Sequence, residues 1–236
     1  MDVSNVIVEP ERHEWVSKAS LGALSLLAAN AGLLLLYFAY DLSLFQLVVV
    51  LWVECFWIGL YSAIKLLTAS IIGNPYENNY VHVTRGSSFL LSVIAIFFVT
   101  AEFIAIFGAT GIAIFFIQDA MSVGDTGELV MDDLGVVLLG SMLFFVGHGI
   151  SYVVNFIILG EYRTATFGKL LTLPFKRCLG LFFSIALTGG VLAFVPQFAT
   201  TTLFAVLLLT LKVLWDYRLH LKEREVLRQS DASAST

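Results

Sequence analysis

Residues 134–159 read LGVVLLGSMLFFVGHGISYVVNFIIL, an apolar run that contains no Lys, Arg, Asp or Glu. A helix that crosses the ~30 Å hydrocarbon core of a bilayer needs about 20 such residues. Transmembrane β-strands have only about 10 residues and alternate in polarity. The run therefore predicts a membrane-spanning helix and excludes a β-barrel.

Five further runs of comparable length and hydropathy surround it, at residues 21–40, 44–67, 89–117, 175–195 and 201–219. Of the 236 residues, 58% are hydrophobic and only 13% are charged, whereas soluble domains have about 45–50% and 25%. This apolar excess must face lipid. We predict an all-α integral membrane protein with a six-transmembrane-helix bundle over residues 20–222, located in the plasma membrane as a multi-pass protein.

The 13 Lys and Arg residues predict the orientation of this bundle. With six spans, all of them fall on one side, so the positive-inside rule places both termini in the cytoplasm. Residues 1–19 then form a cytoplasmic tail, and residues 223–236 are expected to be a disordered tail. The base-free, Asp-rich opposite face suits a salt-rich exterior and suggests a halophilic archaeal source. So few basic residues exclude a nucleic-acid-binding protein.

Three ionisable side chains lie near the middle of their spans: Glu54, Glu102 and His148. Such groups are costly in the bilayer and mark function by default. Their similar depths allow a contact between His148 and a carboxylate. We expect Glu54 to face the bundle interior and to touch a polar group of another helix. The structural alternative is an interhelical hydrogen bond without chemistry.

Two polar stripes are candidates for a ligand site. His148, Ser151, Tyr152 and Asn155 share one helix face because their spacing is i, i+3, i+4, i+7. Lys212, Asp216 and His220 recur every four residues on the last helix, and Asp216 is expected to pair with Lys212 or Arg177. If the two faces meet, they form an aqueous pocket open to the cytoplasm. Lys212 and Arg177 could then hold an anionic small molecule or a lipid phosphate, with Ser151, Tyr152 and Asn155 beside it.

The activity stays open between several alternatives. A membrane-embedded hydrolase would use Glu54, His148 and Asp216 as catalytic groups. A divalent metal bound by His148, Asp216 and His220 would make it metal-dependent, although His148 lies roughly 10 Å deeper than Asp216. A proton- or cation-coupled transporter would bind its ions at Glu54 and His148. The remaining alternative is structural. The polar groups would then only form hydrogen bonds between helices, and those near the cytoplasm would extend to the membrane–water interface.

Several short motifs resemble those of one uncharacterised prokaryotic membrane family, domain of unknown function 6498, over about residues 30–225. The motifs are Trp52-Val53-Glu54 with Gly59 and Lys65, Gly147-His148-Gly149-x-Ser151-Tyr152-x-x-Asn155-Phe156 followed by Glu161-Tyr162, Pro174-Phe175-x-Arg177, and Lys212-x-x-x-Asp216-x-x-x-His220.

The resemblance implies a polytopic helical bundle and no established activity. Many members of that family have histidines in the third-helix region, but residues 97–102 of this chain contain none. A family metal site built on those histidines would be absent here or would use Glu102 instead.

Overall fold

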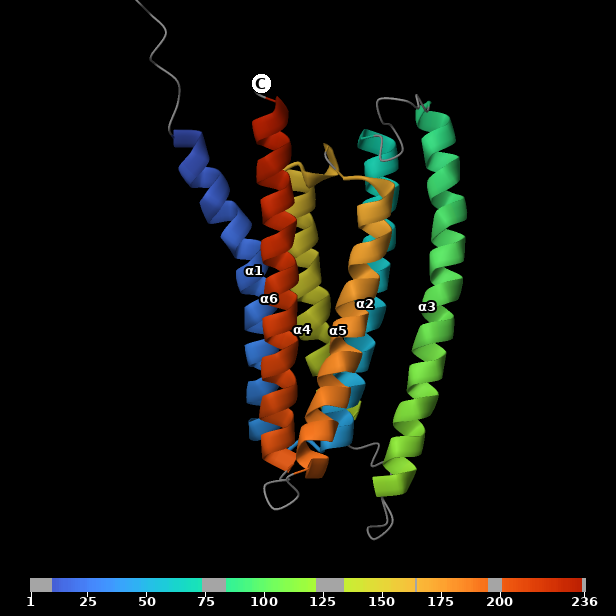
Figure 1. The fold of residues 1–236 in the computed structure, drawn as a ribbon, viewed down its shortest axis with the longest axis vertical. Coiled ribbons are helices and arrows are strands. Elements are labelled where there is room, and N and C mark those ends of the chain that lie inside the picture. The colour runs from blue at the N-terminus through green and yellow to red at the C-terminus, as the bar shows by residue number, and fades with distance from the viewer. Residues whose placement is uncertain (1–9, 74–83, 122–133, 164, 195–200, 235–236) are drawn as a thin grey trace, which may run out of the picture.

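The computed structural model describes residues 10–73, 84–121, 134–163, 165–194 and 201–234. Its long helices run alternately up and down (Figure 1), and no strand occurs within these ranges. The elements are α1 (Pro10–Ala39), α2 (Leu44–Ile72), α3 (Arg85–Met121), α4 (Leu134–Ser151), a π-helix (Tyr152–Ile158), a 3-10 turn (Glu161–Arg163), α5 (Phe167–Phe194) and α6 (Thr201–Ala234). The fold is therefore all-helical, as the apolar runs predict.

Helix length and hydropathy are compatible with a bilayer. Among the described residues, three helical segments are long and apolar enough to cross one: Leu44–Ile72, Leu134–Ile158 and Phe167–Thr188. Large apolar side chains also point outward, with 72% of Phe97 and 70% of Leu35 exposed. Extensive exposed apolar surface marks an interaction site, here compatible with lipid.

Most helices differ from their predicted bounds at one end or at both. α1 begins at Pro10 and α3 at Arg85, both before their apolar runs. α6 continues to Ala234 and so covers most of the segment expected to be a disordered tail. α5 begins at Phe167, which places Pro174 inside the helix and not before it. This extension has a packing reason, since the added turns bury Leu170 in a small cluster with α2.

The end of α4 departs from regular α-helix. From Tyr152 to Ile158 the backbone is π-helical. The segment is followed by Gly160 with φ +74°, a conformation that glycine adopts without steric cost. The chain then returns beside the end of α2, where a side chain at Gly73 would lie 2.9 Å from the carbonyl oxygen of Tyr162. Only a glycine leaves room for this approach.

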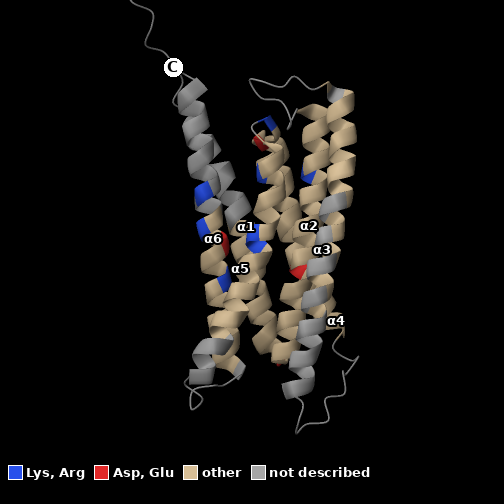
Figure 2. Cartoon of the chain, turned by 45° about the vertical axis from the view of Figure 1, so that its right-hand side comes forward, with Lys and Arg blue, Asp and Glu red and all other residues tan. Residues whose placement is uncertain are grey.

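The helices pack unequally. The main core is formed by side chains of α1, α2, α4, α5 and α6, whereas α3 packs mainly against α2. In Figure 1, α3 correspondingly stands at the edge of the bundle. Few charged side chains interrupt the apolar bundle, and in Figure 2 the coloured Lys and Arg residues lie in its upper and middle parts. Two of the basic residues, Arg177 on α5 and Lys212 on α6, belong to the site described next.

Candidate functional site: an ion cluster beside a cationic pocket

The side chain of Lys212, on α6, lies inside the bundle with only 4% of its surface exposed. Its Nζ is 3.0 Å from Oε1 and 2.9 Å from Oε2 of Glu54 on α2. It also donates to Oδ2 of Asp216 at 2.9 Å and to Oδ1 of Asn30, on α1, at 3.0 Å. We call Asn30, Glu54, Lys212 and Asp216 the ion cluster. It joins three helices through one ammonium group.

The partners of Lys212 match its bonding capacity. Removing an ion from water costs several kcal/mol unless good geometry and further hydrogen bonds compensate. An ammonium has three N–H groups, and three residues accept from it here. Asn30 is itself oriented, because its Nδ2 donates to the carbonyl oxygen of Leu26 at 2.8 Å. The ring of Phe144 lies 5.0 Å from Nζ and adds a cation–π contact. Lys212 is thus held firmly in the interior.

His148 extends this arrangement to α4. Its side chain is 6% exposed, and its Nε2 lies 3.4 Å from Oε1 of Glu54. The separation is longer than a good hydrogen bond, so the contact is chiefly electrostatic. Glu54 is 2% exposed and touches polar groups of both α4 and α6. The prediction that it faces the bundle interior is confirmed.

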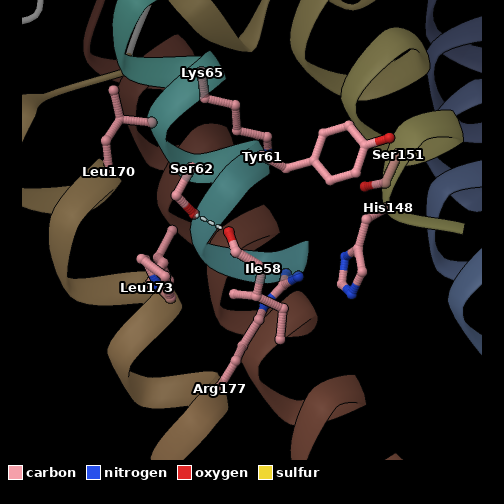
Figure 3. Close-up of a pocket in the computed structure, with 10 residues that line it drawn as sticks. Ile58, Tyr61, Ser62, Lys65, His148, Ser151, Leu170, Leu173 and Arg177 are labelled. Atoms are coloured by element: carbon pink, nitrogen blue, oxygen red, sulfur yellow. Dashed lines mark hydrogen bonds between the residues drawn. The ribbon is translucent and has the colours of Figure 1, made fainter. Parts of the chain in front are cut away.

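A pocket lies on the other side of His148, between α2, α4 and α5 (Figure 3). It is a small cavity of about 50 Å³ and is partly open to the outside. Its lining comes from the second half of α2, the end of α4 and the start of α5. The lining residues are Ile58, Tyr61, Ser62, Lys65, His148, Ser151, Leu170, Leu173, Pro174 and Arg177.

The polar part of this lining has one sign of charge. Lys65 and Arg177 contribute cationic groups, and none of the described lining residues is acidic. Tyr61, Ser62 and Ser151 add hydroxyl groups, of which those of Tyr61 and Ser62 donate to the carbonyl oxygens of Phe145 and Ile58. Cationic groups are the usual partners of phosphate and carboxylate oxygens. The lining is therefore chemically suited to an anion.

The predicted polar stripe of α4 divides at the π-helix. His148 and Ser151 line the pocket, but Tyr152 and Asn155 do not. The Tyr152 hydroxyl is 2.8 Å from Oγ1 of Thr68 on α2, and Asn155 donates to Ser151 Oγ at 3.3 Å. The wider turn of a π-helix changes which residues share a face, so the α-helical spacing no longer applies beyond Ser151.

The two predicted cationic partners are also separated. Asp216 pairs with Lys212, one of the two pairings expected from the sequence. Lys212 is bound by carboxylates in the ion cluster, whereas Arg177 lines the pocket together with Lys65. The expectation that Lys212 and Arg177 hold the same anion does not match this geometry, because Glu54 and Asp216 occupy the donors of Lys212.

The described side chains contain no group of three or more His, Cys, Asp and Glu placed to hold a metal ion. His148 is in contact with Glu54 and Asp216 with Lys212, so an ammonium group stands between the two carboxylates. The side chains of His220 and Glu102 lie outside the described ones. The proposed metal set of His148, Asp216 and His220 is therefore described only for its first two members.

Sequence reasoning missed part of this site. Asn30 interrupts an apolar run, which is a usable signal for a buried polar partner. Lys65 also has a signal, but its position near a helix end is explained equally well by a side chain that reaches the interface. Tyr61 and Ser62 carry no signal, since hydroxyl residues are common in membrane helices and bond their own backbone, as Ser62 does to Ile58.

Comparison with known proteins agrees with the sequence motifs. No curated protein and no solved structure matches the chain. A family model matches residues 15–233 and is described as a family of unknown function, DUF6498. The match includes every residue of the ion cluster and of the pocket lining. Because it covers nearly the whole length of the chain, the chain belongs to the DUF6498 family.

Proposed function

We propose that this protein is a six-span membrane protein with both termini in the cytoplasm, and that its pocket binds an anionic ligand of the phosphate type from the cytoplasmic side. The observation that carries the proposal is the lining of the pocket, which combines Lys65 and Arg177 with three hydroxyl residues and no described acidic group. Two chemical sources are compatible with it: a free oxyanion and the phosphate of a lipid headgroup.

The environment of the pocket supports an anion further. Arg177 and His148 both line the pocket, so a bound ligand would meet the charges of both groups. Charge interactions are several-fold stronger in a low-dielectric interior than in water. A bound anion would face Lys65 and Arg177 directly, while the negative charges of Glu54 and Asp216 are engaged by Lys212.

The orientation is supported by the single-sided distribution of the basic residues. The pocket lies toward the ends of α2 and α4 and the beginning of α5, at the same end of the bundle as the carboxyl end of α6 (Figure 1). In a six-span topology this end faces the cytoplasm. An entrance there would admit a soluble anion, and a lipid headgroup could reach it from the inner leaflet.

Topology is tested by labelling single cysteines in a background that carries Cys55→Ala and Cys178→Ala. We expect an impermeant maleimide to label Asp125→Cys on intact cells and Asp231→Cys only after permeabilisation. Labelling of both positions from the same side would overturn the six-span arrangement.

Ligand binding is tested by calorimetry on the protein in lipid nanodiscs. The probes are sulfate and dihexanoyl phosphatidylglycerol, and the zwitterionic dihexanoyl phosphatidylcholine is the control. We expect Arg177→Gln and Lys65→Gln to weaken binding by about tenfold or more each, the value of one charge-assisted hydrogen bond. The matched control is Lys176→Gln, beside Arg177 but exposed and outside the lining.

The pattern across probes identifies the source. Sulfate binding alone indicates a soluble oxyanion, and binding of the phosphatidylglycerol alone indicates a headgroup. If neither probe binds, or if all three variants behave alike, the proposal is wrong.

A second candidate function, an ester hydrolase in the same pocket, is favoured by the contact between Glu54 and His148. A carboxylate next to a histidine can hold the ring in one tautomer and support it as a general base. Hydrolysis of p-nitrophenyl acetate by the nanodisc-embedded protein tests this candidate. We expect loss of turnover in His148→Gln with the fold retained, and absence of turnover in the unmodified protein would exclude the candidate for this ester.

A further inference from the structure

The pocket lies where two groups of packed side chains meet. The main core extends over α1, α2, α4, α5 and α6. A second group of four buried residues, which we call the end cluster, consists of Leu66, Ala69, Phe156 and Leu170. The pocket lining includes Ile58 of the main core and Leu170 of the end cluster. The cavity therefore marks a boundary in the packing of the bundle.

Two of the three helices around the pocket depart from regular α-helix at this boundary. On α4, the π-helix begins at Tyr152, directly after the lining residue Ser151. On α5, the lining residue Pro174 lies inside the helix. Because proline has no N–H, the carbonyl oxygen of Leu170 receives no backbone hydrogen bond from position 174. Helices bend most readily at prolines and at π-helical turns.

The part of α5 that precedes Pro174 is anchored less firmly than the rest of the helix. Of residues 167–173, all of which the structure describes, only Leu170 is buried. After the proline, α5 buries Cys178 and Leu181 in the main core. Segments with few buried apolar contacts open at a lower free energy than the core does. We therefore expect residues 167–173 to separate from the bundle before the rest of α5.

The same two turns form one wall of the pocket. Leu170 and Leu173 line it from α5, and Figure 3 shows them on the side opposite His148 and Ser151 of α4. Both residues of α4 are buried. A rotation of residues 167–173 about Pro174 would withdraw Leu170 from the end cluster and widen the cavity toward His148 and Ser151.

The volume of the cavity gives a reason for such a movement. About 50 Å³ is enclosed, whereas ligand pockets usually measure roughly 300–1,000 Å³. A ligand as large as a lipid phosphate fits only if one wall moves. Of the three walls, the one built by residues 167–173 combines weak anchoring with a proline at its base.

We propose that residues 167–173 are a hinged lid, which turns about Pro174 and opens the pocket to a ligand. The structure then represents the closed state. The inference deepens the proposed function by naming the entrance of the pocket, and it rests on that function only for the identity of what enters. Opening of the lid is a property of the chain alone, so it is tested without any anion.

Two variants change the lid in opposite directions. Pro174→Ala restores the N–H that can bond the Leu170 carbonyl oxygen, and alanine favours a helix. Amide hydrogen exchange at residues 170–173 should then slow by about fivefold to tenfold, the value of one hydrogen bond. Leu170→Ala removes the anchor in the end cluster and should accelerate the same amides by about tenfold or more. Exchange is measured by mass spectrometry on the full chain in lipid nanodiscs.

Matched controls separate the lid from general effects of the substitutions. Pro10→Ala changes the first residue of α1, where proline interrupts no helical hydrogen bond. Leu179→Ala truncates an exposed leucine of α5 outside the pocket lining. Neither control should alter exchange at residues 170–173. If Pro174→Ala and Leu170→Ala leave this exchange unchanged as well, the inference is wrong.

A second measurement shows whether the pocket itself opens. Ser151→Cys is placed in the background that carries Cys55→Ala and Cys178→Ala, and its labelling by N-ethylmaleimide, a neutral reagent too large for the closed cavity, is timed. Adding Pro174→Ala should slow labelling by about fivefold to tenfold, and adding Leu170→Ala should accelerate it. Labelling of Lys176→Cys, an exposed position of α5, should be the same in all three backgrounds. Absence of labelling at position 151, or a rate that neither variant changes, overturns the lid.

Failure of the lid and failure of the proposed function give different results. If exchange and labelling respond as expected but neither sulfate nor dihexanoyl phosphatidylglycerol binds, the lid stands and the anion site is wrong. If an anion binds while exchange and labelling are insensitive to both variants, the anion site stands and the lid is wrong.

Discussion

Lys212 on α6 and Glu54 on α2 form a buried ion pair across the bundle, 158 residues apart in sequence and 2.9 Å apart in space. Removing either partner leaves a buried charge, whereas replacing both removes the charge and its compensation together. This asymmetry makes the pair accessible to mutational analysis.

Lys212→Met is expected to destabilise the protein by about 3–5 kcal/mol, because Glu54 and Asp216 then lose their shared cation. Adding Glu54→Gln and Asp216→Asn should recover much of the loss. Thermal unfolding in detergent, monitored by size-exclusion chromatography, measures both the loss and the recovery of stability. Lys222→Met, at an exposed position of the same helix, serves as control. A Lys212→Met protein as stable as the control would contradict the role given to the ion cluster.

Gly180 on α5 lies against the ring of Trp215 on α6, whose Nε1 donates to the Lys176 carbonyl oxygen at 3.0 Å. A methyl group at position 180 would overlap this ring. Gly180→Ala should therefore lower the free energy of unfolding by about 1–3 kcal/mol. Gly168→Ala is the matched control, because the space around Gly168 is open and alanine favours a helix. Equal stability of the two variants would show that Trp215 moves aside without cost.

Trp52 attaches α3 to α2. Its ring stacks on Phe107 with centroids 3.7 Å apart, and its Nε1 donates to the Phe107 carbonyl oxygen at 3.1 Å. Trp52→Phe keeps the stacking but loses the hydrogen bond, so we expect a loss of about 1 kcal/mol. Trp52→Ala should lose about 3–5 kcal/mol. Because both variants lack a tryptophan, unfolding is measured by circular dichroism in detergent and not by tryptophan fluorescence. A loss for Trp52→Phe as large as that for Trp52→Ala would contradict the role given to stacking.

The Tyr152 hydroxyl fixes the π-helix to α2 through Thr68. Thr68 Oγ1 already donates to the Ile64 carbonyl oxygen at 2.8 Å, so Tyr152 is the donor in this contact. Tyr152→Phe should cost about 1 kcal/mol and accelerate amide hydrogen exchange selectively within residues 152–158. Tyr217→Phe, an exposed tyrosine of α6, is the control. Unchanged exchange would mean that packing alone holds the segment.

Much of the architecture is predictable because an apolar run of this length has few alternatives to a helix. The interior position of Glu54 is predictable for a similar reason, since a midplane carboxylate cannot face lipid at low cost. The pairing of Asp216 with Lys212 follows from their i, i+4 spacing on α6. These three predictions use only neighbouring residues in the sequence. The structure agrees with them because packing in the bundle places the same demands on these residues.

Other features depend on tertiary packing that no local pattern encodes. The contact between Asn30 and Lys212 joins positions 182 residues apart. The start of α5 at Phe167 depends on the burial of Leu170, and the division of the polar residues of α4 depends on the π-helix. The sequence around Tyr152–Ile158 is almost entirely apolar, so it contains no hydrophobic periodicity from which the wider turn of a π-helix could be recognised. The separation of the cations into an ion cluster and a pocket was unpredictable for the same reason.

The π-helix between Tyr152 and Ile158 has a consequence for sequence length. A π turn holds roughly one residue more than an α turn, so the segment stores one residue of slack next to the site. Deleting a single residue there would convert it to α-helix and leave His148 and Ser151 in place. Because the stored residue is the one removed, the residues after the deletion would keep roughly their orientation, and Glu161 and Tyr162 would stay beside α2. A second deletion would find no slack and would rotate everything after it by about 100°. Natural relatives are therefore expected to differ by at most one residue in the count between His148 and Gly160.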